Sequence, residues 1–286
     1  MRILVTGANG LLGRKLTDLI KTTGNTELLA ATRATLDVTK ADELNSTVQK
    51  FRPDVIINAA AMTQVDQCEL NHDECWKQNV GSVANLVDVC TKNRIHLIHV
   101  STDFVFNGNE GPLDETAIPD PVNFYGKSKL EGERIILESK CRAAIIRTVL
   151  VYGVTSDMSR SNIVLWVKKS LEEKKHIKVV NDQFRTPTLA EDLASGCLLA
   201  AQKRATGIYH VSGYEMMTPY EIAIKTADFF GLDKSFISPT TNFIQPAKRP
   251  LKTGFIIDKA KRELGYEPHS FEQGLRIVKE QVLLNT

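Results

Sequence analysis

The feature that most constrains this chain is a rhythm of short apolar runs, separated by helical patterns, in its first half. The runs cover residues 3–6, 28–32, 55–58, 96–101 and 143–148. They are partly β-branched and continuously apolar, as expected for strands covered on both faces. Because strand-helix-strand crossovers are right-handed and impose parallel pairing, the pattern predicts an α/β fold with a doubly wound parallel sheet.

Beyond residue 150 the rhythm loosens, which indicates a second part of the chain. The pattern predicts a helix over 162–173, a strand over 177–180, a helix over 189–202 and a strand over 208–212. The helix over 189–202 and the strand over 208–212 could still join the first sheet, so we expect some segments between about 162 and 212 to return to it. Residues 1–150 are thus expected to form a Rossmann-type domain, and residues 151–286 mainly a smaller carboxyl-terminal α/β domain.

The carboxyl third contains two further predicted helices. Thr218 is a capping residue and Pro219 suits the first helical position, so one helix is expected from Pro219 to Phe230. A closing helix is expected from Phe271 to Leu284.

Composition narrows the class of protein and its partners. The 286 residues are 42% hydrophobic and 24% charged, which is typical of soluble globular proteins. The formal net charge of +2 gives no strong field for a phosphate backbone, so we expect no nucleic-acid partner. The first apolar run is too short for a secretory signal, and no run reaches the length of a membrane span. We therefore expect no membrane partner and a cytoplasmic location.

The cysteines and histidines predict neither a disulfide framework nor a metal site. The five cysteines lack Cys-x-x-Cys spacing, and the six histidines lack His-x-His or His-x-x-x-His pairs. We expect reduced, mostly structural thiols. Asp66, Glu69 and Glu115 could bind a divalent ion, but exposed loop carboxylates explain them equally well, so no metal is assigned.

A glycine motif lies directly between the first predicted strand and helix. Glycine at these positions allows a tight turn and close approach of the backbone to a pyrophosphate, which the positive helix end stabilises. A glycine-rich turn without a ligand is the alternative, and the flanking strand and helix favour the dinucleotide. The predicted cofactor-binding residues here are Gly7, Asn9, Gly10, Leu11, Leu12 and Gly13.

The end of the second predicted strand indicates which dinucleotide binds. Many NAD enzymes carry an acidic residue there for the adenosine ribose, whereas this chain carries Arg33. An arginine suits a 2′-phosphate, and a solvated arginine at a strand end is the alternative. The sequence favours NADPH as cofactor, with NADH as the alternative.

Tyr125 and Lys129 form the single Tyr-x-x-x-Lys pair of the chain. Residues four apart share a helix face, so the lysine ammonium can favour the phenolate and lower the tyrosine pKa. The tyrosine could then exchange protons near neutrality. Taken alone, the pair is better explained by a tyrosine at a helix start beside an exposed lysine.

Ser101-Thr102-Asp103 gives this pair more weight, because it ends the fourth predicted strand at the expected cofactor edge of the sheet. A hydroxyl from Thr102 or Ser101 can donate to a carbonyl oxygen, and Tyr125 can protonate the developing alkoxide. Lys129 can hold the nicotinamide ribose. The combination predicts a hydride-transfer site; if the Thr102 hydroxyl only bonds the backbone, the Tyr125 argument still stands.

These motifs, with Asn58 to Ala61 after the third strand, resemble those of the extended short-chain dehydrogenase/reductases. More narrowly, residues 52–61, 101–106, 125–130 and 181–183 resemble the dTDP-4-dehydrorhamnose reductase family, and the likeness runs nearly end to end. The resemblance implies an NAD(P)H-dependent oxidoreductase acting on CH-OH groups. It would reduce the 4-keto group of a dTDP-activated deoxysugar, dTDP-4-dehydrorhamnose to dTDP-rhamnose, for cell-surface polysaccharide.

The resemblance also implies roles for individual residues. Tyr125 would be the proton donor, Lys129 its partner, and Thr102 and Asp103 contacts to the sugar. The dinucleotide would further be lined by Asp37, Val38, Ala59, Ala60 and Ala61. The nucleotide diphosphate of the sugar would be bound by segments containing Asn181, Gln183 and Arg249. An exposed basic loop explains Lys248 and Arg249 equally well.

Two departures from the family pattern leave the sugar open. Leu150 stands where the rhamnose-pathway reductases commonly carry a tryptophan that packs on the sugar nucleotide, so that aromatic surface is expected to be missing. Arg185 stands where a glycine is usual and adds a cation that could alter the substrate pocket.

Alternative functions follow from the same motifs. The chain could be another nucleotide-sugar reductase or an epimerase, since that wider family shares the glycine motif and the Tyr/Lys pair. It could also be a regulatory subunit resembling that of methionine adenosyltransferase, which binds NADP. Related reductases often dimerise, so a homodimer stays open.

Overall fold

A six-stranded parallel sheet forms the larger part of the protein, with strand order β2-β1-β3-β4-β5-β9. The computed structural model describes residues 1–154, 162–241 and 245–284. The strands are β1 (Arg2–Thr6), β2 (Glu27–Ala31), β3 (Val55–Asn58), β4 (His96–Thr102), β5 (Ala143–Thr148) and β9 (Gly207–His210). All pairings in this sheet are parallel, which confirms the predicted doubly wound α/β fold.

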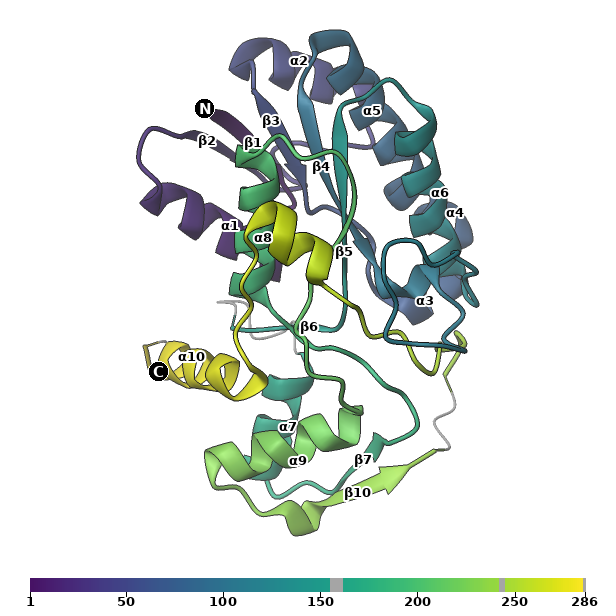
Figure 1. Cartoon of the computed structure of the whole chain (residues 1–286), viewed down its shortest axis with the longest axis vertical. Coiled ribbons are helices and arrows are strands. Elements are labelled where there is room, and N and C mark those ends of the chain that lie inside the picture. The colour runs from purple at the N-terminus through teal and green to yellow at the C-terminus, as the bar shows by residue number, and fades with distance from the viewer. Residues whose placement is uncertain (155–161, 242–244, 285–286) are drawn as a thin grey trace.

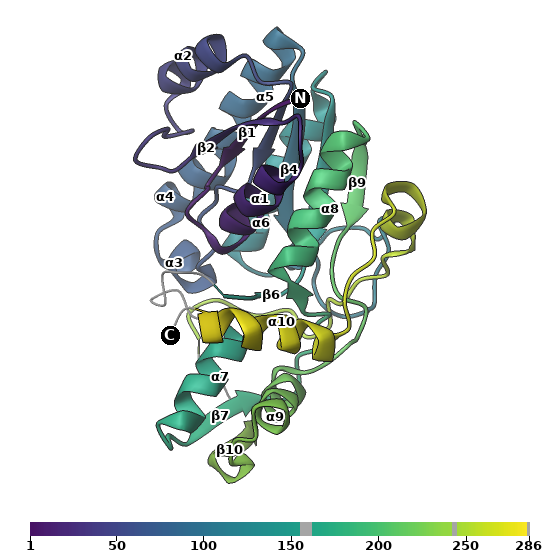
Figure 2. The ribbon, with the colours of Figure 1, turned by 90° about the vertical axis from the view of Figure 1, so that its left-hand side faces the viewer.

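Helices cover both faces of the sheet, as Figures 1 and 2 show. One face carries α1 (Leu11–Thr22) and α8 (Ala190–Gln202), and the other carries α2 (Ala41–Phe51), α5 (Ser82–Asn93) and α6 (Phe124–Glu138). Alternate residues of a strand point to opposite faces. Accordingly Ile3 and Val5 pack against α1 and α8, whereas Leu4 packs against α2 and α5.

Shorter helical elements follow the third and fourth strands. After β3 come α3 (Val65–Leu70), α4 (His72–Trp76) and a π-helical turn, Lys77–Gly81, that leads into α5. A 3₁₀ turn, Asp103–Val105, follows β4. These elements surround the carboxyl ends of the central strands, where ligands bind in open parallel sheets.

A smaller group of elements lies below the sheet in Figure 1. It contains α7 (Ile163–Glu172), α9 (Pro219–Phe230) and α10 (Phe271–Leu284), together with two parallel strand pairs. One pair is β7 (Ile177–Val180) with β10 (Ile237–Thr240), and the other is β6 (Val151–Tyr152) with β8 (Thr188–Leu189). The predicted start of α9 is confirmed: Thr218 and Glu221 form a reciprocal capping box with Pro219 in the first turn.

The stretch from 162 to 212 is divided between the two groups. Helix α8 and strand β9 join the six-stranded sheet, whereas α7 packs on α9, and β7 pairs with β10 (Figure 2). The apolar face of α7 explains this placement, because Val167 packs with Ala223 of α9 rather than with the main sheet. Of the segments between 162 and 212, α8 and β9 are therefore the ones that pack with or join the main sheet. Strand β9 ends at His210, two residues before the predicted end.

None of the helices in the described part of the chain has the length and apolar character needed to cross a membrane.

Candidate active site

Three adjoining cavities form one groove along the carboxyl ends of the strands. We call them the glycine-loop cavity (about 230 Å³), the central cavity (about 510 Å³) and the outer cavity (about 570 Å³). Gly10, Ala59 and Ala61 line both the first and the second. Leu150, Val151 and Asn162 line both the second and the third. A long ligand can therefore run from one end to the other.

The glycine loop between β1 and α1 is packed directly against the loop that follows β3. Gly7 has a φ of +68°, and a Cβ there would lie 2.8 Å from the backbone of Ala59 and Ala60. A Cβ at Gly13 would lie 2.2 Å from the Gly7 carbonyl oxygen. Both positions therefore require glycine, and the backbone itself forms the wall of the cavity.

The start of α1 offers backbone donors to this groove. Gly10 is its N-cap, and no side-chain hydrogen bond caps the first turn. Leu11 and Leu12 of that turn line the central cavity. Free N–H groups at a helix start, with the positive end of the helix dipole, suit a phosphate or pyrophosphate.

Charged groups lie at the far edge of the glycine-loop cavity. Arg33 and Asp37 line it together with Val38. The Arg33 guanidinium lies 3.2 Å from the Glu74 carboxylate and is largely exposed. A hydrogen bond from the Thr39 hydroxyl lowers the pKa of Asp37, although burial opposes this. All the residues predicted to bind cofactor line either this cavity or the central one.

Tyr125 is placed beside Thr102 by the start of α6. The Asn123 side chain accepts a hydrogen bond of 2.8 Å from the Gly126 N–H and so caps the helix. A Cβ at Gly126 would lie 2.1 Å from the Phe104 carbonyl oxygen, so glycine is needed for this close approach. The first turn of α6 is thereby held directly against the chain that follows β4.

The pKa of Tyr125 is raised, whereas the sequence predicted it lowered. Burial is the main cause, and a hydrogen bond with Thr102 acts in the opposite direction. The prediction had assumed that the Lys129 ammonium dominates. In the protein alone, desolvation of the phenolate outweighs any such attraction, so Tyr125 stays protonated at neutral pH.

Thr102 ends β4 and lines the central cavity. Its hydroxyl donates to Asp103 Oδ1 at 3.1 Å and accepts from the Phe104 N–H at 3.2 Å. The hydroxyl therefore has local partners, as the alternative interpretation of this residue proposed, and it also bonds Tyr125.

Lys129 is fully buried, and its amine contacts β4. Nζ donates to the Val100 carbonyl oxygen at 2.8 Å and lies 3.2 Å from His99 Nε2. Burial lowers the pKa of Lys129 to about 8, and the nearby Glu133 carboxylate opposes this. A lysine with such a pKa changes its charge close to neutral pH.

His99 connects Lys129 to the loop after β3, and sequence analysis did not identify it. The Asn58 amide oxygen accepts from the Ala60 N–H at 3.3 Å, so its amino group faces His99 Nδ1 at 3.1 Å. Neutral His99 must then carry its proton on Nε2 and donate it to Lys129. An ammonium has no acceptor, so this arrangement corresponds to an uncharged Lys129 amine. The signal that could have found His99 is a histidine between apolar residues in the middle of β4.

Asp103 and Arg185, which were both expected to contact the substrate, form a buried ion pair with each other. Asp103 lines the central cavity, and its carboxylate lies 3.5 Å from Arg185 Nε and also accepts from the Thr253 hydroxyl. Burial raises the pKa of Asp103 despite the Arg185 cation. Arg185 also donates to the carbonyl oxygens of Pro250 and Leu251.

Arg185 is therefore used to hold the chain around residues 250–253. It is not among the described residues that line the three cavities, which differs from the expectation of an added cation in the pocket. The physical reason is that its guanidinium is already paired with Asp103 and with backbone carbonyl oxygens outside the cavities.

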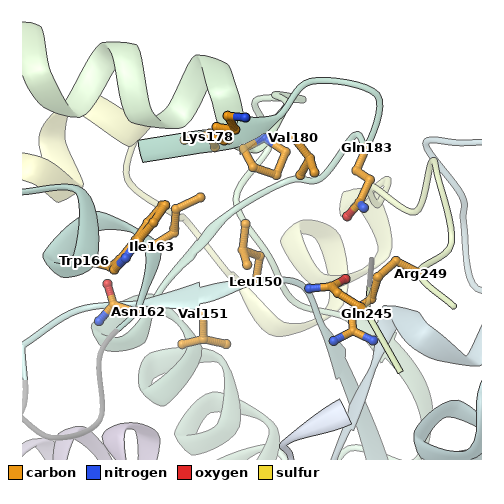
Figure 3. A pocket seen from close by; sticks show the side chains of 12 residues that line it. Leu150, Val151, Asn162, Ile163, Trp166, Lys178, Val180, Gln183, Gln245 and Arg249 are labelled. Atoms are coloured by element: carbon orange, nitrogen blue, oxygen red, sulfur yellow. The ribbon is translucent and has the colours of Figure 1, made fainter. Parts of the chain in front are cut away.

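The outer cavity contains three of the predicted substrate residues: Leu150, Gln183 and Arg249 (Figure 3). Leu150 has a φ of +38°, an uncommon conformation for a branched side chain that places it at the junction of the central and outer cavities. Arg249 also lies 3.0 Å from the Asp66 carboxylate. Asn181 is exposed, is not among the described lining residues, and its backbone N–H donates to Thr240.

The outer cavity also holds an aromatic side chain that sequence analysis missed. Trp166, on α7, lines the cavity opposite the polar end formed by Gln245 and Arg249 (Figure 3). Position 150 carries no aromatic side chain, and Trp166 supplies one at another place in the cavity. The sequence signal was a tryptophan one turn after the helix start at Asn162.

The carboxylates considered for a divalent ion each have another partner in the structure. Asp66 pairs with Arg249, Glu69 accepts from the Phe124 N–H, and Glu115 accepts from the His210 N–H. Within residues 1–154, 162–241 and 245–284, no cluster of three or more possible ligands occurs. All five cysteines are free thiols, and all except Cys141 are buried.

Comparison with known proteins identifies the family. Residues 1–283 match the family described as RmlD substrate binding domain. The chain belongs to this family. The resemblance to dTDP-4-dehydrorhamnose reductases that the motifs indicated is thereby confirmed.

Individual relatives of the RmlD family are similar over nearly the whole chain. A dTDP-4-dehydrorhamnose reductase from Aggregatibacter actinomycetemcomitans is 34% identical and covers 97% of this chain and 98% of its own. Methionine adenosyltransferase 2 subunit beta from Mus musculus is also 34% identical, over 87% of this chain and 78% of its own. The structure of a dTDP-4-dehydrorhamnose reductase from Bacillus anthracis in complex with NADP matches with a TM-score of 0.89 and 29% identity, over 98% and 99%.

Proposed function

We propose that the protein is an NAD(P)H-dependent reductase that converts the 4-keto group of a dTDP-activated deoxysugar, dTDP-4-dehydrorhamnose, to the alcohol of dTDP-rhamnose. The observation that carries this proposal is the continuous groove, in which Thr102, Tyr125 and Lys129 lie between a glycine loop and an outer cavity that contains Arg249. The relatives named as dTDP-4-dehydrorhamnose reductases support it. Its product would enter cell-surface polysaccharide synthesis in the cytoplasm.

The glycine-loop and central cavities fit a dinucleotide. The close packing of Gly7 and Gly13 leaves backbone, rather than side chains, facing the groove, and the uncapped start of α1 supplies donors for the pyrophosphate. Asp37, Val38 and Arg33 would hold the adenosine end, and Lys129 the nicotinamide ribose. When bound, the reduced nicotinamide supplies a hydride. The related structure in complex with NADP supports this assignment.

Tyr125 supplies the proton in the proposed reaction. Its raised pKa keeps the phenol protonated, which is the form that a proton donor to a developing alkoxide requires. The Thr102 hydroxyl, turned from Asp103 toward the substrate oxygen, gives a second donor to the same oxygen. An ammonium on Lys129 favours the phenolate left after the transfer.

The test is a steady-state assay that follows loss of reduced nicotinamide with dTDP-4-dehydrorhamnose, dTDP-4-keto sugars of other configuration and the corresponding UDP sugars. Rapid oxidation with dTDP-4-dehydrorhamnose and formation of dTDP-rhamnose support the proposal. If NADPH is oxidised only with another nucleotide sugar, the protein is still a reductase, but its substrate is that other sugar. Tightly retained NAD with sugar isomerisation would instead indicate an epimerase.

A second candidate function is a regulatory subunit. The similarity to methionine adenosyltransferase 2 subunit beta favours it, as does Leu150 in place of an aromatic residue. The presence of Thr102, Tyr125 and Lys129 in one cavity favours the reductase. A protein that binds NADPH but oxidises it with none of the nucleotide sugars, and that co-purifies with a methionine adenosyltransferase, would support the regulatory role.

A further inference from the structure

Trp166 presents an aromatic surface inside the outer cavity that no described side chain of the protein covers fully. The residue is 38% exposed, although indole rings are usually well packed. It lines the cavity together with Ile163, one turn earlier on the same helix face (Figure 3). A large apolar surface left open within a concave site is typical of a place where a ligand packs.

The start of α7 fixes the direction in which Trp166 points. Asn162 accepts from the Leu165 N–H at 3.3 Å and donates to the Gly153 carbonyl oxygen at 2.7 Å, so the first turn is anchored to the chain after β6. Val164 and Leu165 are buried in the core. Because helix residues three apart share a face, Ile163 and Trp166 are left together on the cavity side.

The remaining lining of the cavity indicates the chemistry of the ligand. Asn162 lies beside the indole, Lys178 lies on β7, and Gln183, Gln245 and Arg249 lie at the end opposite Trp166 (Figure 3). A planar ring packs favourably on the indole face, and a diphosphate is favoured near Arg249. A nucleoside diphosphate has both parts.

The junction with the central cavity orients such a ligand. Leu150 and Val151 line both cavities, so a group beyond the diphosphate can extend past them to Tyr125. With the base against Trp166 and the diphosphate toward Arg249, the sugar lies in the central cavity. The volume of about 570 Å³ lies within the range of small-molecule sites.

We propose that Trp166 is the platform on which the base of the nucleotide-sugar substrate stacks, so that α7 rather than position 150 supplies the aromatic contact. This inference rests on the proposed function and deepens it, because it assigns the base-binding end of the site to a named residue. It makes Trp166 a specificity-determining residue for the nucleobase and leaves the reacting atoms to Tyr125 and Thr102.

The chain allows a direct test, since it contains two tryptophans. Trp76 lies on α4 and packs against Phe124, so the Trp76→Phe variant leaves Trp166 as the only tryptophan. Titration of this variant with dTDP should change the Trp166 fluorescence saturably, whereas inorganic pyrophosphate, which has no base, should leave it almost unchanged. The Trp76→Phe variant should bind dTDP as the wild type does.

Affinity supplies the second measurement. By calorimetry, Trp166→Ala should weaken dTDP binding at least about tenfold, in line with the loss of one base–aromatic stack, and Trp166→Phe should restore part of it. NADPH affinity should not change in either variant, because Trp166 is not among the residues that line the glycine-loop and central cavities. An unchanged NADPH affinity also shows that the variants are folded.

The outcomes separate this inference from the proposed function. Unchanged dTDP affinity in Trp166→Ala, or no change of Trp166 fluorescence on saturation, overturns the platform, and reductase activity would then stand alone. A fluorescence change and weakened binding without NADPH oxidation by any of the nucleotide sugars would uphold the platform and reject the reductase. A wild-type protein that binds no dTDP overturns both.

Discussion

At the scale of single residues, the account depends on which proton each group holds. Tyr125 and Lys129 are both buried, and burial favours the neutral form of each: it raises the pKa of the phenol and lowers that of the amine. The donor pattern from Asn58 through His99 agrees with an uncharged Lys129. Without ligand, the site therefore holds a protonated phenol beside an amine that changes its charge near pH 8, and proton uptake by Lys129 is tied to its contact with His99.

Replacement of His99 by glutamine should raise the pKa of Lys129. Glutamine can turn its amide oxygen toward Nζ and accept from the ammonium, which His99 in its present tautomer cannot do. Activity that needs the Lys129 cation falls as the pH rises through about 8 in the wild type, and this limb should move to higher pH in His99→Gln. The pH dependence of kcat checks this, with lysine side-chain NMR as a direct readout. A limb that stays in place or moves lower contradicts the inferred tautomer.

Arg33 should set the preference between the two dinucleotides. Arg33→Ala should weaken NADPH binding about tenfold or more, because a charge-assisted hydrogen bond to a phosphate contributes about 1.5–3 kcal/mol, and should leave NADH binding unchanged. Glu74→Gln is the matched variant, since it frees Arg33 from its ion pair and should tighten NADPH slightly. Dissociation constants from fluorescence titration decide the matter. Unchanged binding of both cofactors would show that Arg33 is only a solvated surface residue, and equal losses for both would show that it does not read the 2′-phosphate.

At the scale of helices and strands, a buried ion pair links α6 to β5 beneath the active site. Arg147 Nη2 lies 2.6 Å from Glu133 Oε2, and both side chains are almost fully inaccessible. Ser101 on β4 donates to the same carboxylate at 2.5 Å. Three elements that carry or flank Thr102, Tyr125 and Lys129 are thus held together by one carboxylate.

Removal of one partner of this ion pair should be strongly destabilising. Arg147→Leu leaves the Glu133 charge buried and unpaired, so we expect the free energy of unfolding to fall by about 3–5 kcal/mol. Urea denaturation followed by circular dichroism measures it. The double variant Arg147→Leu/Glu133→Leu should recover much of the loss. If the double variant lost as much free energy of unfolding as the Arg147→Leu and Glu133→Leu variants do together, the account would be contradicted.

The strands and helices whose bounds were predicted from the sequence agree with the structure to within about two residues, because continuous apolar runs and clear capping residues mark them. The short strands β6, β8 and β10 were not predicted. Strand β3 was predicted with its observed bounds, and so were α9 and α10. The sequence indicated that the helix over 189–202 and the strand over 208–212 could join the first sheet, and α8 and β9 do so. The placement of α7 was left open. The choice depends on which face of α7 meets α9, and that contact is non-local.

The candidate site shows the same limit. The glycine loop, Thr102, Tyr125 and Lys129 were predictable because each belongs to a local motif. His99 and Trp166 were missed, since their roles arise only when β4 meets α6 and when α7 closes the outer cavity. Arg185 was wrongly assigned to the pocket. Its ion pair with Asp103 joins residues far apart in the sequence, so it could not be predicted.

At the scale of the whole molecule, the groove joins the six-stranded sheet to the smaller group of elements. We propose that residues 1–150 form the NAD(P)-binding domain and that residues 151–286 mainly form the substrate domain, with α8 and β9 returned to the first (Figure 1). Cofactor would occupy the sheet edge and the nucleotide the smaller part. The chain near residues 247–250 bridges the two, since Asp66 accepts from the Ala247 N–H and Asn123 donates to the Lys248 carbonyl oxygen.

The most direct test of the central claim is a comparison of the wild type with Tyr125→Phe in the reduction of dTDP-4-dehydrorhamnose by NADPH. A general acid contributes about 10² to 10⁴ in rate, so the variant should lose at least about a hundredfold in kcat. Its NADPH affinity, measured by fluorescence titration, should stay unchanged because the phenylalanine keeps the ring in place. Full activity in Tyr125→Phe, with cofactor bound as in the wild type, would contradict the assignment of Tyr125 as the proton donor.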